Sequence, residues 1–186
     1  ISSSSFPGCF NVVKSTFLLN LCSFSGCHAA GNNECFGKIA FIQESTTAIS
    51  HFSAYLCGPL LSNMGDSIVV FSNSKVETRY YNASNCYGRD GGAISFYSNP
   101  CENSVYYLNI VDCIDHNSFE TTGSSYSTVV YQSNFLNSSK NSACVICANG
   151  APCKFVSCVF TKKHSLFISG NSAVTFVDCI TDTSDS

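Results

Sequence analysis

The sequence contains little charge. Only 11% of its 186 residues are Asp, Glu, Lys or Arg, whereas ordinary globular proteins carry about a quarter. Nine Lys and Arg against twelve Asp and Glu give a net charge of −3. A nucleic-acid-binding protein needs a positively charged surface, which this balance does not supply. The sequence therefore predicts no nucleic-acid partner.

Long apolar runs are also missing. The longest, such as Ile39–Ile42 and Ile68–Phe71, are far shorter than the ~20 residues of a membrane-spanning helix, so no membrane span is expected in this segment. Ala, Leu, Glu and Lys are too sparse for a helical bundle. Trp is absent, but 15 Phe and 9 Tyr exclude a disordered chain. A β-rich domain remains.

Small polar residues and cysteine are abundant instead, with 32 Ser, 17 Asn, 11 Thr and 13 Cys. This cysteine content is high for a reducing cytosol and suits a secreted or cell-surface protein. Two sequons, at Asn82 and Asn137, point to the same compartment and predict N-linked glycans at both positions.

The cysteines indicate a repeat. The tetrapeptide Val111–Ile114 recurs letter for letter as Val177–Ile180, with a close variant around Cys158. Residues at the same place in the pattern predict one column along a stack of coils. Its members are Cys22, Cys57, Cys86, Cys113, Asn134, Cys158 and Cys179.

A second series of short apolar runs interleaves with this column at a similar loose period. Its members are residues 38–42, 67–71, 92–96, 118–120, 142–146 and 165–168. Two interleaved series of short strands between polar turns predict an all-β solenoid, a right-handed single-stranded parallel β-helix of about six or seven coils. An antiparallel β-sandwich with coincidental spacing is the alternative.

The repeat also suggests boundaries. Residues 1–14 are expected to form an N-terminal cap or linker, residues 15–181 the parallel β-helix, and residues 182–186 a C-terminal tail. Solenoid ends normally carry a polar cap, because they expose unpaired strand edges. A tail this short favours self-association or stacking on another β-helix, and a segment cut from a longer rod is the alternative.

Two motifs resemble a known family. Gly91–Ile94 matches the GGAI element of polymorphic outer-membrane protein repeats, and Phe17–Asn20 and Phe96–Asn99 match their FxxN element. Those repeats build right-handed parallel β-helices on bacterial surface adhesins, with cysteine-rich relatives on protist cell surfaces. The resemblance implies the same fold and an adhesive role at a cell surface, with a host glycan or surface protein as a partner.

The cysteines allow two main interpretations. Adjacent rungs of a parallel stack lie ~4.8 Å apart, within the range of a disulfide, while a buried free thiol also packs as a small apolar group. Candidate disulfide residues outside the column are Cys27, as a partner of Cys22, and Cys144 with Cys153. A zinc site built from Cys144, Cys147, Cys153 and Cys158 is less favoured, and neither a metal nor another cofactor is expected.

Catalytic residues are not evident. Asp112 and Asp178 precede equivalent cysteines, but three coils would separate them by ~14 Å, too far for the ~5–9.5 Å of a glycosidase pair. A polysaccharide-binding or -degrading enzyme of the pectate-lyase type is the alternative. The sequence favours a non-enzymatic structural subunit of an extracellular assembly, or an adhesin. Its candidate recognition face is Tyr80, Tyr81, Tyr106 and Tyr107.

Overall fold

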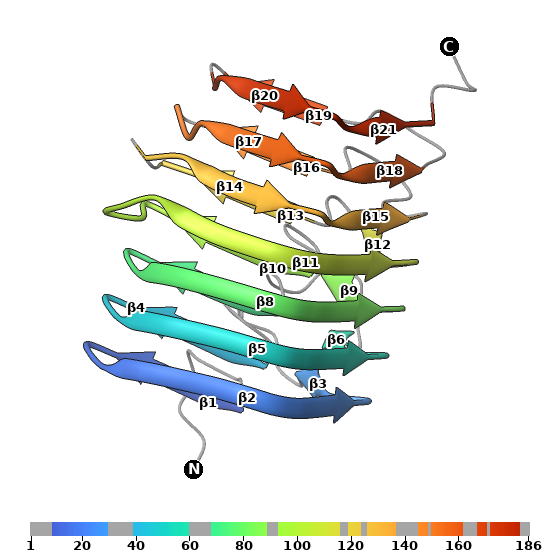
Figure 1. The fold of residues 1–186 in the computed structure, drawn as a ribbon. Helices are drawn as coiled ribbons and strands as arrows, with labels where there is room; N and C mark the ends of the chain where they lie inside the picture. Colours follow the sequence, from blue (N-terminus) through green and yellow to red (C-terminus); the bar gives the residue numbers. More distant parts are fainter. Residues whose placement is uncertain are drawn as a thin grey trace.

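The structure is a computed structural model. It describes residues 9–29, 39–59, 68–88, 93–115, 119–123, 126–136, 145–148, 150–161, 167–170 and 172–182. Its strands pair in parallel with neighbours one coil away and stack into a β-solenoid (Figure 1). The predicted all-β parallel solenoid is thereby confirmed, and the antiparallel sandwich is excluded.

One sheet contains the predicted apolar runs. Its seven strands pair in chain order, each on the next coil. They are β1 (Phe10–Val13), β4 (Ala40–Gln43), β7 (Val69–Ser72), β10 (Ile94–Tyr97), β13 (Phe119–Thr122), β16 (Val145–Ala148) and β19 (Phe167–Gly170). The strands begin one to three residues later than predicted, and the stack already includes Phe10, ahead of the predicted start at residue 15.

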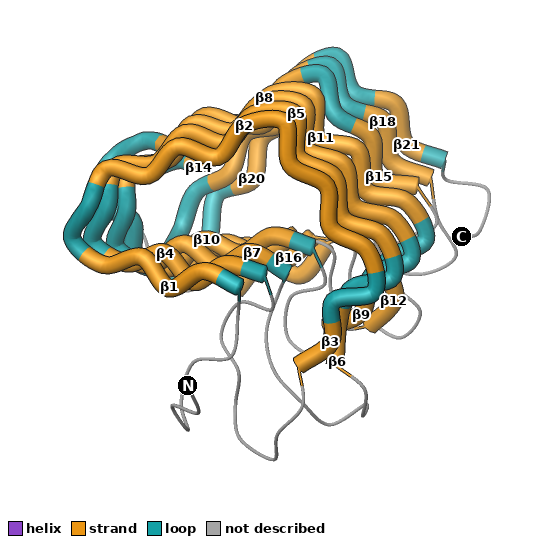
Figure 2. The backbone as a smooth tube through the Cα atoms, turned by 90° about the horizontal axis from the view of Figure 1, so that it is seen from below, coloured by secondary structure: helices purple, strands orange, loops and turns teal. Residues whose placement is uncertain are grey.

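The opposite sheet holds the longer strands. Its main path is β2 (Thr16–Ser25), β5 (Thr46–Tyr55), β8 (Lys75–Ser84), β11 (Asn103–Val111), β14 (Thr128–Tyr131), β17 (Cys153–Val156) and β20 (Val174–Val177). In the later coils the long strand is divided, and β15 (Asn134–Leu136), β18 (Val159–Thr161) and β21 (Ile180–Thr181) continue it. Viewed along the stack, the two sheets face each other across the interior (Figure 2).

Two small parallel pairs complete the described strands. They are β3 (His28–Ala29) with β6 (Gly58–Pro59), and β9 (Tyr87–Gly88) with β12 (Ile114–Asp115). Figure 2 places these short strands beyond the corner where the long strands end.

The core is built from side chains that repeat at one position on successive coils. Phe71 stacks on Phe96 with ring centroids 5.2 Å apart, and Phe52 stacks on Tyr81 at 4.6 Å. All four side chains are buried. Because each coil repeats the backbone path of its neighbour, aromatic rings at one position stack nearly parallel, which adds to the stability gained from burial.

The coils turn at three corners, each with one residue in the left-handed backbone conformation. Fourteen of these residues are not glycine, with φ between 47° and 56°. The corner between the two sheets has Lys14, Glu44, Asn73, Ser98 and Gly123; the corner within the long strands has Leu21, His51, Tyr80, Tyr107, Gln132, Ser157 and Asp178; the corner after them has Gly26, Leu56, Asn85 and Asp112. This conformation costs a non-glycine residue about 1 kcal/mol or more.

A small polar side chain often follows the left-handed residue and bonds back across the corner. The Ser45, Ser74 and Ser133 hydroxyls donate to the carbonyl two residues earlier, at 2.7–2.9 Å. The thiols of Cys22, Cys57, Cys86, Cys113, Cys158 and Cys179 make the same contact at 3.3–3.6 Å. These three serines and six of the 13 cysteines therefore help to form corners.

This shared corner pattern explains why the predicted cysteine column is partly wrong. Cys57, Cys86 and Cys113 do form one column, but its fourth cysteine is Cys27. Cys22, Cys158 and Cys179 belong to the corner within the long strands, in the column of Phe52, Tyr81, Leu108 and Ser133. Asn134 pairs with Asn109 and Val159 and lies outside both columns.

The corner between the two sheets also connects successive coils. The Ser15 amide donates to the Ser45 hydroxyl, and the Ser45 amide donates to the Ser74 hydroxyl, each at 3.1 Å. The Ser74 amide donates to Oδ1 of Asn99 at 3.0 Å. Ser45 and Ser74 therefore hold their own corners, and all three side chains accept a backbone amide of the preceding coil.

Replacing Ser74 by Ala is expected to lower the free energy of unfolding by about 1–3 kcal/mol, because the buried Ser45 amide loses its acceptor. Chemical denaturation measures the change. Ser23→Ala, at an exposed position, is the control and should change stability by less than ~0.5 kcal/mol. Equal effects of the two substitutions would contradict the role of this corner.

Candidate functional site

An aromatic column lies on the outside of the corner within the long strands. The imidazole of His51 stacks on Tyr80 with centroids 4.8 Å apart, and Tyr80 stacks on Tyr107 at 4.7 Å. Tyr80 is 44% and Tyr107 39% exposed. The left-handed corner turns these side chains outward, so three consecutive coils present a row of rings to solvent.

A second column runs beside it, one residue earlier in each strand. Tyr106 stacks on Tyr131 with centroids 4.7 Å apart, and the guanidinium of Arg79 lies 4.9 Å from the centre of the Tyr106 ring. Arg79 also forms an ion pair with Glu77 at 2.7 Å. We call His51, Tyr80, Tyr107, Arg79, Tyr106 and Tyr131 the aromatic strip.

The strip corrects part of the predicted recognition face. Tyr81 points inward, is fully buried, and donates its hydroxyl to the carbonyl of Ala93 at 2.7 Å. Tyr80 is stacked on both sides, so a ligand meets its edge and hydroxyl rather than a ring face. The strip therefore offers a row of hydrogen-bonding groups spaced by the coil repeat.

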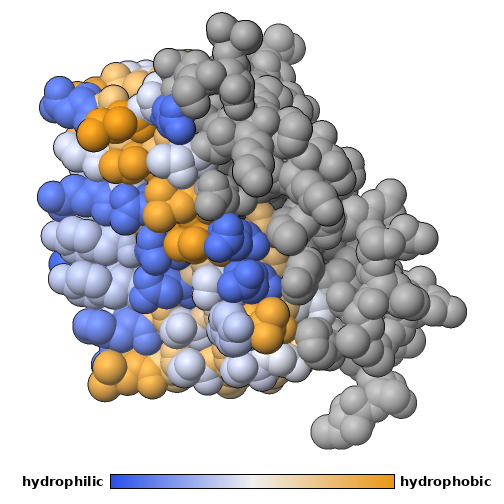
Figure 3. Space-filling model, turned by 90° about the vertical axis from the view of Figure 1, so that its right-hand side faces the viewer, coloured by the Kyte–Doolittle hydropathy of each residue, from blue (hydrophilic) through white to orange (hydrophobic). Residues whose placement is uncertain are grey.

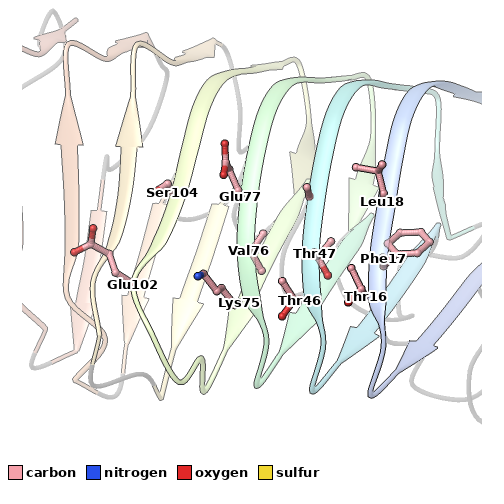
Figure 4. A pocket seen from close by; sticks show the side chains of 11 residues that line it. Thr16, Phe17, Leu18, Thr46, Thr47, Lys75, Val76, Glu77, Glu102 and Ser104 are labelled. Atoms are coloured by element: carbon pink, nitrogen blue, oxygen red, sulfur yellow. The ribbon is translucent and has the colours of Figure 1, made fainter.

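An open groove of about 410 Å³ lies on the sheet of long strands, nearer the corner between the two sheets (Figure 4). Thr16, Thr46 and Lys75 follow one another along one row, and Leu18, Ala48, Glu77 and Ser104 along another. Its charged groups are Lys75, Glu77 and Glu102. Apart from these groups and the threonine and serine hydroxyls, the surface that lines the groove is mostly apolar.

The third candidate is the column of Cys27, Cys57, Cys86 and Cys113, which we call the sulfur ladder. The last three thiols are buried and the first is partly exposed. Hydrogen bonds link the thiols of neighbouring rungs, and the thiol of the exposed Cys9 is hydrogen-bonded to that of Cys27.

These contacts raise the pKa of the Cys57 and Cys86 thiols. The hydrogen bond with Cys113, together with burial, raises the pKa of Cys86 to about 12, and the hydrogen bond with Cys86, together with burial, raises the pKa of Cys57 well above its usual range. In the other cysteine column, burial raises the pKa of Cys158 to about 11. Thiols of this kind are poor nucleophiles at neutral pH.

The predicted pairing of Cys22 with Cys27 is wrong, because both thiols are free and the two residues belong to different corners. Cys153 is disulfide-bonded, while its predicted partner Cys144 lies outside the described residues. Of the two sequons, Asn82 is exposed on β8, and Asn137 also lies outside the described residues.

The aspartates do not form a pair. Asp112 is the left-handed residue of the last corner, whereas Asp178 holds that position in the corner within the long strands. They therefore do not share a column, as the recurring tetrapeptide suggested. Among the residues that the structure describes, no three His, Cys, Asp or Glu side chains gather in a way that could hold a metal ion.

The sequence interpretation missed His51, Arg79 and Tyr131 as members of the strip. A signal for His51 was present, since His51, Tyr80 and Tyr107 each precede a ladder cysteine by six residues.

Figure 3 shows the side of the stack where the long strands end, and there the visible described residues mix hydrophilic and hydrophobic types. In the described part of the chain, no helix is long and apolar enough to cross a membrane.

Comparisons with known proteins identify no relatives of this chain. No protein-family model matches it, and neither a curated protein nor a solved structure gives a match. Any function must therefore be argued from the aromatic strip, the sulfur ladder and the ends of the stack.

The raised thiol pKa values predict a loss of stability in alkali. Cysteines in the unfolded chain lose their protons near pH 8.5, whereas Cys57, Cys86 and Cys158 keep theirs when folded. Between pH 9 and 11 each thiol should therefore lower the free energy of unfolding by about 1.4 kcal/mol per pH unit.

Denaturation across this pH range measures the slope. Cys86→Ser should make it shallower by about 1.4 kcal/mol per pH unit. Phe52→Leu, which alters the core without removing a thiol, should lower stability by the same amount at every pH. The prediction fails when Cys86→Ser keeps the wild-type slope.

Proposed function

We propose that the chain is a non-enzymatic, secreted or cell-surface protein, built as a right-handed β-helix of six or seven coils, which serves as a structural subunit of an extracellular assembly. The high cysteine content and the sequons at Asn82 and Asn137 support the compartment. The resemblance of Gly91–Ile94 to the GGAI element supports a place among surface β-helix proteins.

The two ends of the described stack carry this proposal. Within the described residues, β2 has a strand partner on one edge only, and so do β20 and β21. Large apolar side chains are exposed at both ends, including Leu18 at 71%, Leu21 at 76% and Ile180 at 65%. Unpaired strand edges with exposed apolar groups favour pairing with another chain.

A second copy of the chain fits these edges, because the last coil continues the columns of the first. Following the strand register through the stack, Phe176 falls in the column of Leu19, and Cys179 in that of Cys22. A copy added in this register would place its Leu21 beside Asp178. Such head-to-tail contact does not close on itself and therefore produces filaments.

Substitutions that introduce a charge at Leu21 test this register. Leu21→Asp would meet Asp178 of the neighbouring copy, whereas Leu21→Lys would form an ion pair with it. Like charges on adjacent strands cost up to ~1 kcal/mol, so the association constant should be several-fold weaker for Leu21→Asp than for Leu21→Lys, with a smaller difference in high salt.

Sedimentation velocity over a concentration series, with negative-stain images, measures the association. Leu56→Asp is the control, because Leu56 is a left-handed corner residue of similar chemistry within the stack; it should associate like the wild type. A wild-type protein that stays monomeric at every concentration would rule out self-assembly.

The aromatic strip favours a second role, adhesion to a glycan or a surface protein. Tyrosine hydroxyls, Arg79 and the imidazole of His51 supply donors and acceptors at a regular spacing on one face. Such amphipathic side chains are common where proteins bind sugars and protein surfaces.

Tyr80→Ala and Tyr107→Ala are expected to lower binding at least tenfold on a glycan array or to intact cells, because each removes a hydroxyl and the stacking that orients its neighbour. Tyr55→Ala, at an exposed tyrosine outside the strip, serves as the control and should bind like the wild type. Equal binding by all three variants would exclude the strip as the recognition face.

A further inference from the structure

The aromatic strip contains two pairs of tyrosines on neighbouring coils. Tyr80 stacks on Tyr107 with an angle of 7° between the ring planes, and Tyr106 stacks on Tyr131 with an angle of 8°. In both pairs the ring centroids are 4.7 Å apart, near the lower limit of the ~4.5–7 Å found for paired aromatic rings. The two rings of each pair are therefore in direct contact.

The strand register holds these rings together. Tyr106 pairs with Tyr131 between β11 and β14, and the residues on both sides of Tyr80 and Tyr107 pair between β8 and β11. These three strands follow one another in the stack (Figure 1). Because the paired backbone fixes where each side chain begins, the two rings of a pair stay neighbours while the coils remain folded.

Among the described residues, neither pair has a third tyrosine in its column. The neighbours of the two pairs along their columns are other side chains, namely His51, Arg79, Gln132 and Val156. Within the same residues, Tyr107 and Tyr131 have a stacked ring on one side only, so each ring can tilt without breaking another stack. A reaction between phenols is therefore confined to the two rings of each pair.

The four rings are accessible to an oxidant in solution. Tyr80 and Tyr107 are exposed, and Tyr106 and Tyr131 are partly exposed. In the part of the chain that the structure describes, none of their hydroxyls forms a hydrogen bond with the protein, whereas the buried Tyr81 donates its hydroxyl to a backbone carbonyl. A proton lost from the strip on oxidation can therefore pass directly to water.

We propose that the aromatic strip is a site of oxidative cross-linking, in which Tyr80 bonds to Tyr107 and Tyr106 bonds to Tyr131 through ring carbons. The oxidant is hydrogen peroxide, activated by a haem peroxidase. Contact between the rings makes the coupling an intramolecular step, which is favoured over coupling between two molecules. No part of this chemistry depends on self-assembly or adhesion, so its test is separate from the tests of those roles.

The atoms and electrons of the reaction balance. Each of the two phenols in a pair gives up one electron and its hydroxyl proton and becomes a phenoxyl radical. The two radicals join through ring carbons next to their oxygens, and the hydrogens on those two carbons move to the oxygens, which restores both hydroxyls. Hydrogen peroxide takes up the two electrons and two protons and becomes two molecules of water.

The two bonds join three consecutive coils. One bond connects β8 to β11, and the other connects β11 to β14. A covalent bond between coils persists when the backbone hydrogen bonds break, and it restricts the unfolded chain as a disulfide does. The cross-linked protein should therefore unfold at a higher denaturant concentration than the untreated protein.

Substitution by phenylalanine tests each bond, because it removes the hydroxyl and keeps the ring. Tyr107→Phe should lose the first cross-link, Tyr131→Phe the second, and the double variant both. Tyr55→Phe is the control, because Tyr55 is exposed but stacks on no ring among the described residues. The control variant should form both cross-links.

In the experiment, dilute folded protein is treated with a haem peroxidase and hydrogen peroxide, after its accessible thiols have been alkylated so that they do not consume the oxidant. Monomeric product is isolated on a denaturing gel, and its dityrosine fluorescence is measured. Mass spectrometry after proteolysis then identifies the cross-linked peptides, each two hydrogen atoms lighter than the two peptides that it joins. The same treatment in urea, where the stacks are lost, is the second control.

Both cross-links in the wild type, one in each single variant and none in the double variant support the proposal. Cross-links found only between molecules would overturn it, as would an equal loss from Tyr55→Phe and Tyr107→Phe. An equal yield of the same two cross-links from folded protein and from protein oxidised in urea would also overturn it, because then the stacking does not direct the reaction.

Discussion

Each coil depends on a corner that a single left-handed residue turns and a following side chain holds. Fourteen non-glycine residues take this strained conformation, at a cost of about 1 kcal/mol or more apiece. Hydrogen bonds across the corner and to the next coil offset that cost, as at Ser45 and Ser74. With the corners fixed, the strands are aligned in register, and every column of the core and surface follows from that alignment.

The low charge and the excess of Ser, Asn and Cys then have one structural explanation. Columns place identical positions ~4.8 Å apart, where like charges repel and small hydrogen-bonding groups or stacked rings are stable. Arg79 is a charged residue within such a column. Arg79 lies beside Glu77 and over Tyr106, so its charge is balanced within the aromatic strip.

The sequence was enough to predict the parallel solenoid, because the apolar runs that became β4, β7 and β10 recur with a regular period. It was not enough to assign the cysteines, because Cys22 and Cys27 each follow a left-handed residue at different corners. Only the register, set by pairing over whole coils, separates them. The same limitation affected Tyr81, whose neighbour Tyr80 turns outward at the corner while Tyr81 itself enters the core.

The direction of the backbone hydrogen bonds has a mechanical consequence. They run from coil to coil along the stack, so tension applied along that axis loads the bonds of one coil boundary together and opens it as a unit. Tension applied along the strands shears many bonds in parallel. A protein of this construction resists being pulled sideways more strongly than being pulled apart end from end, and cross-links between rungs would strengthen it in its weaker direction.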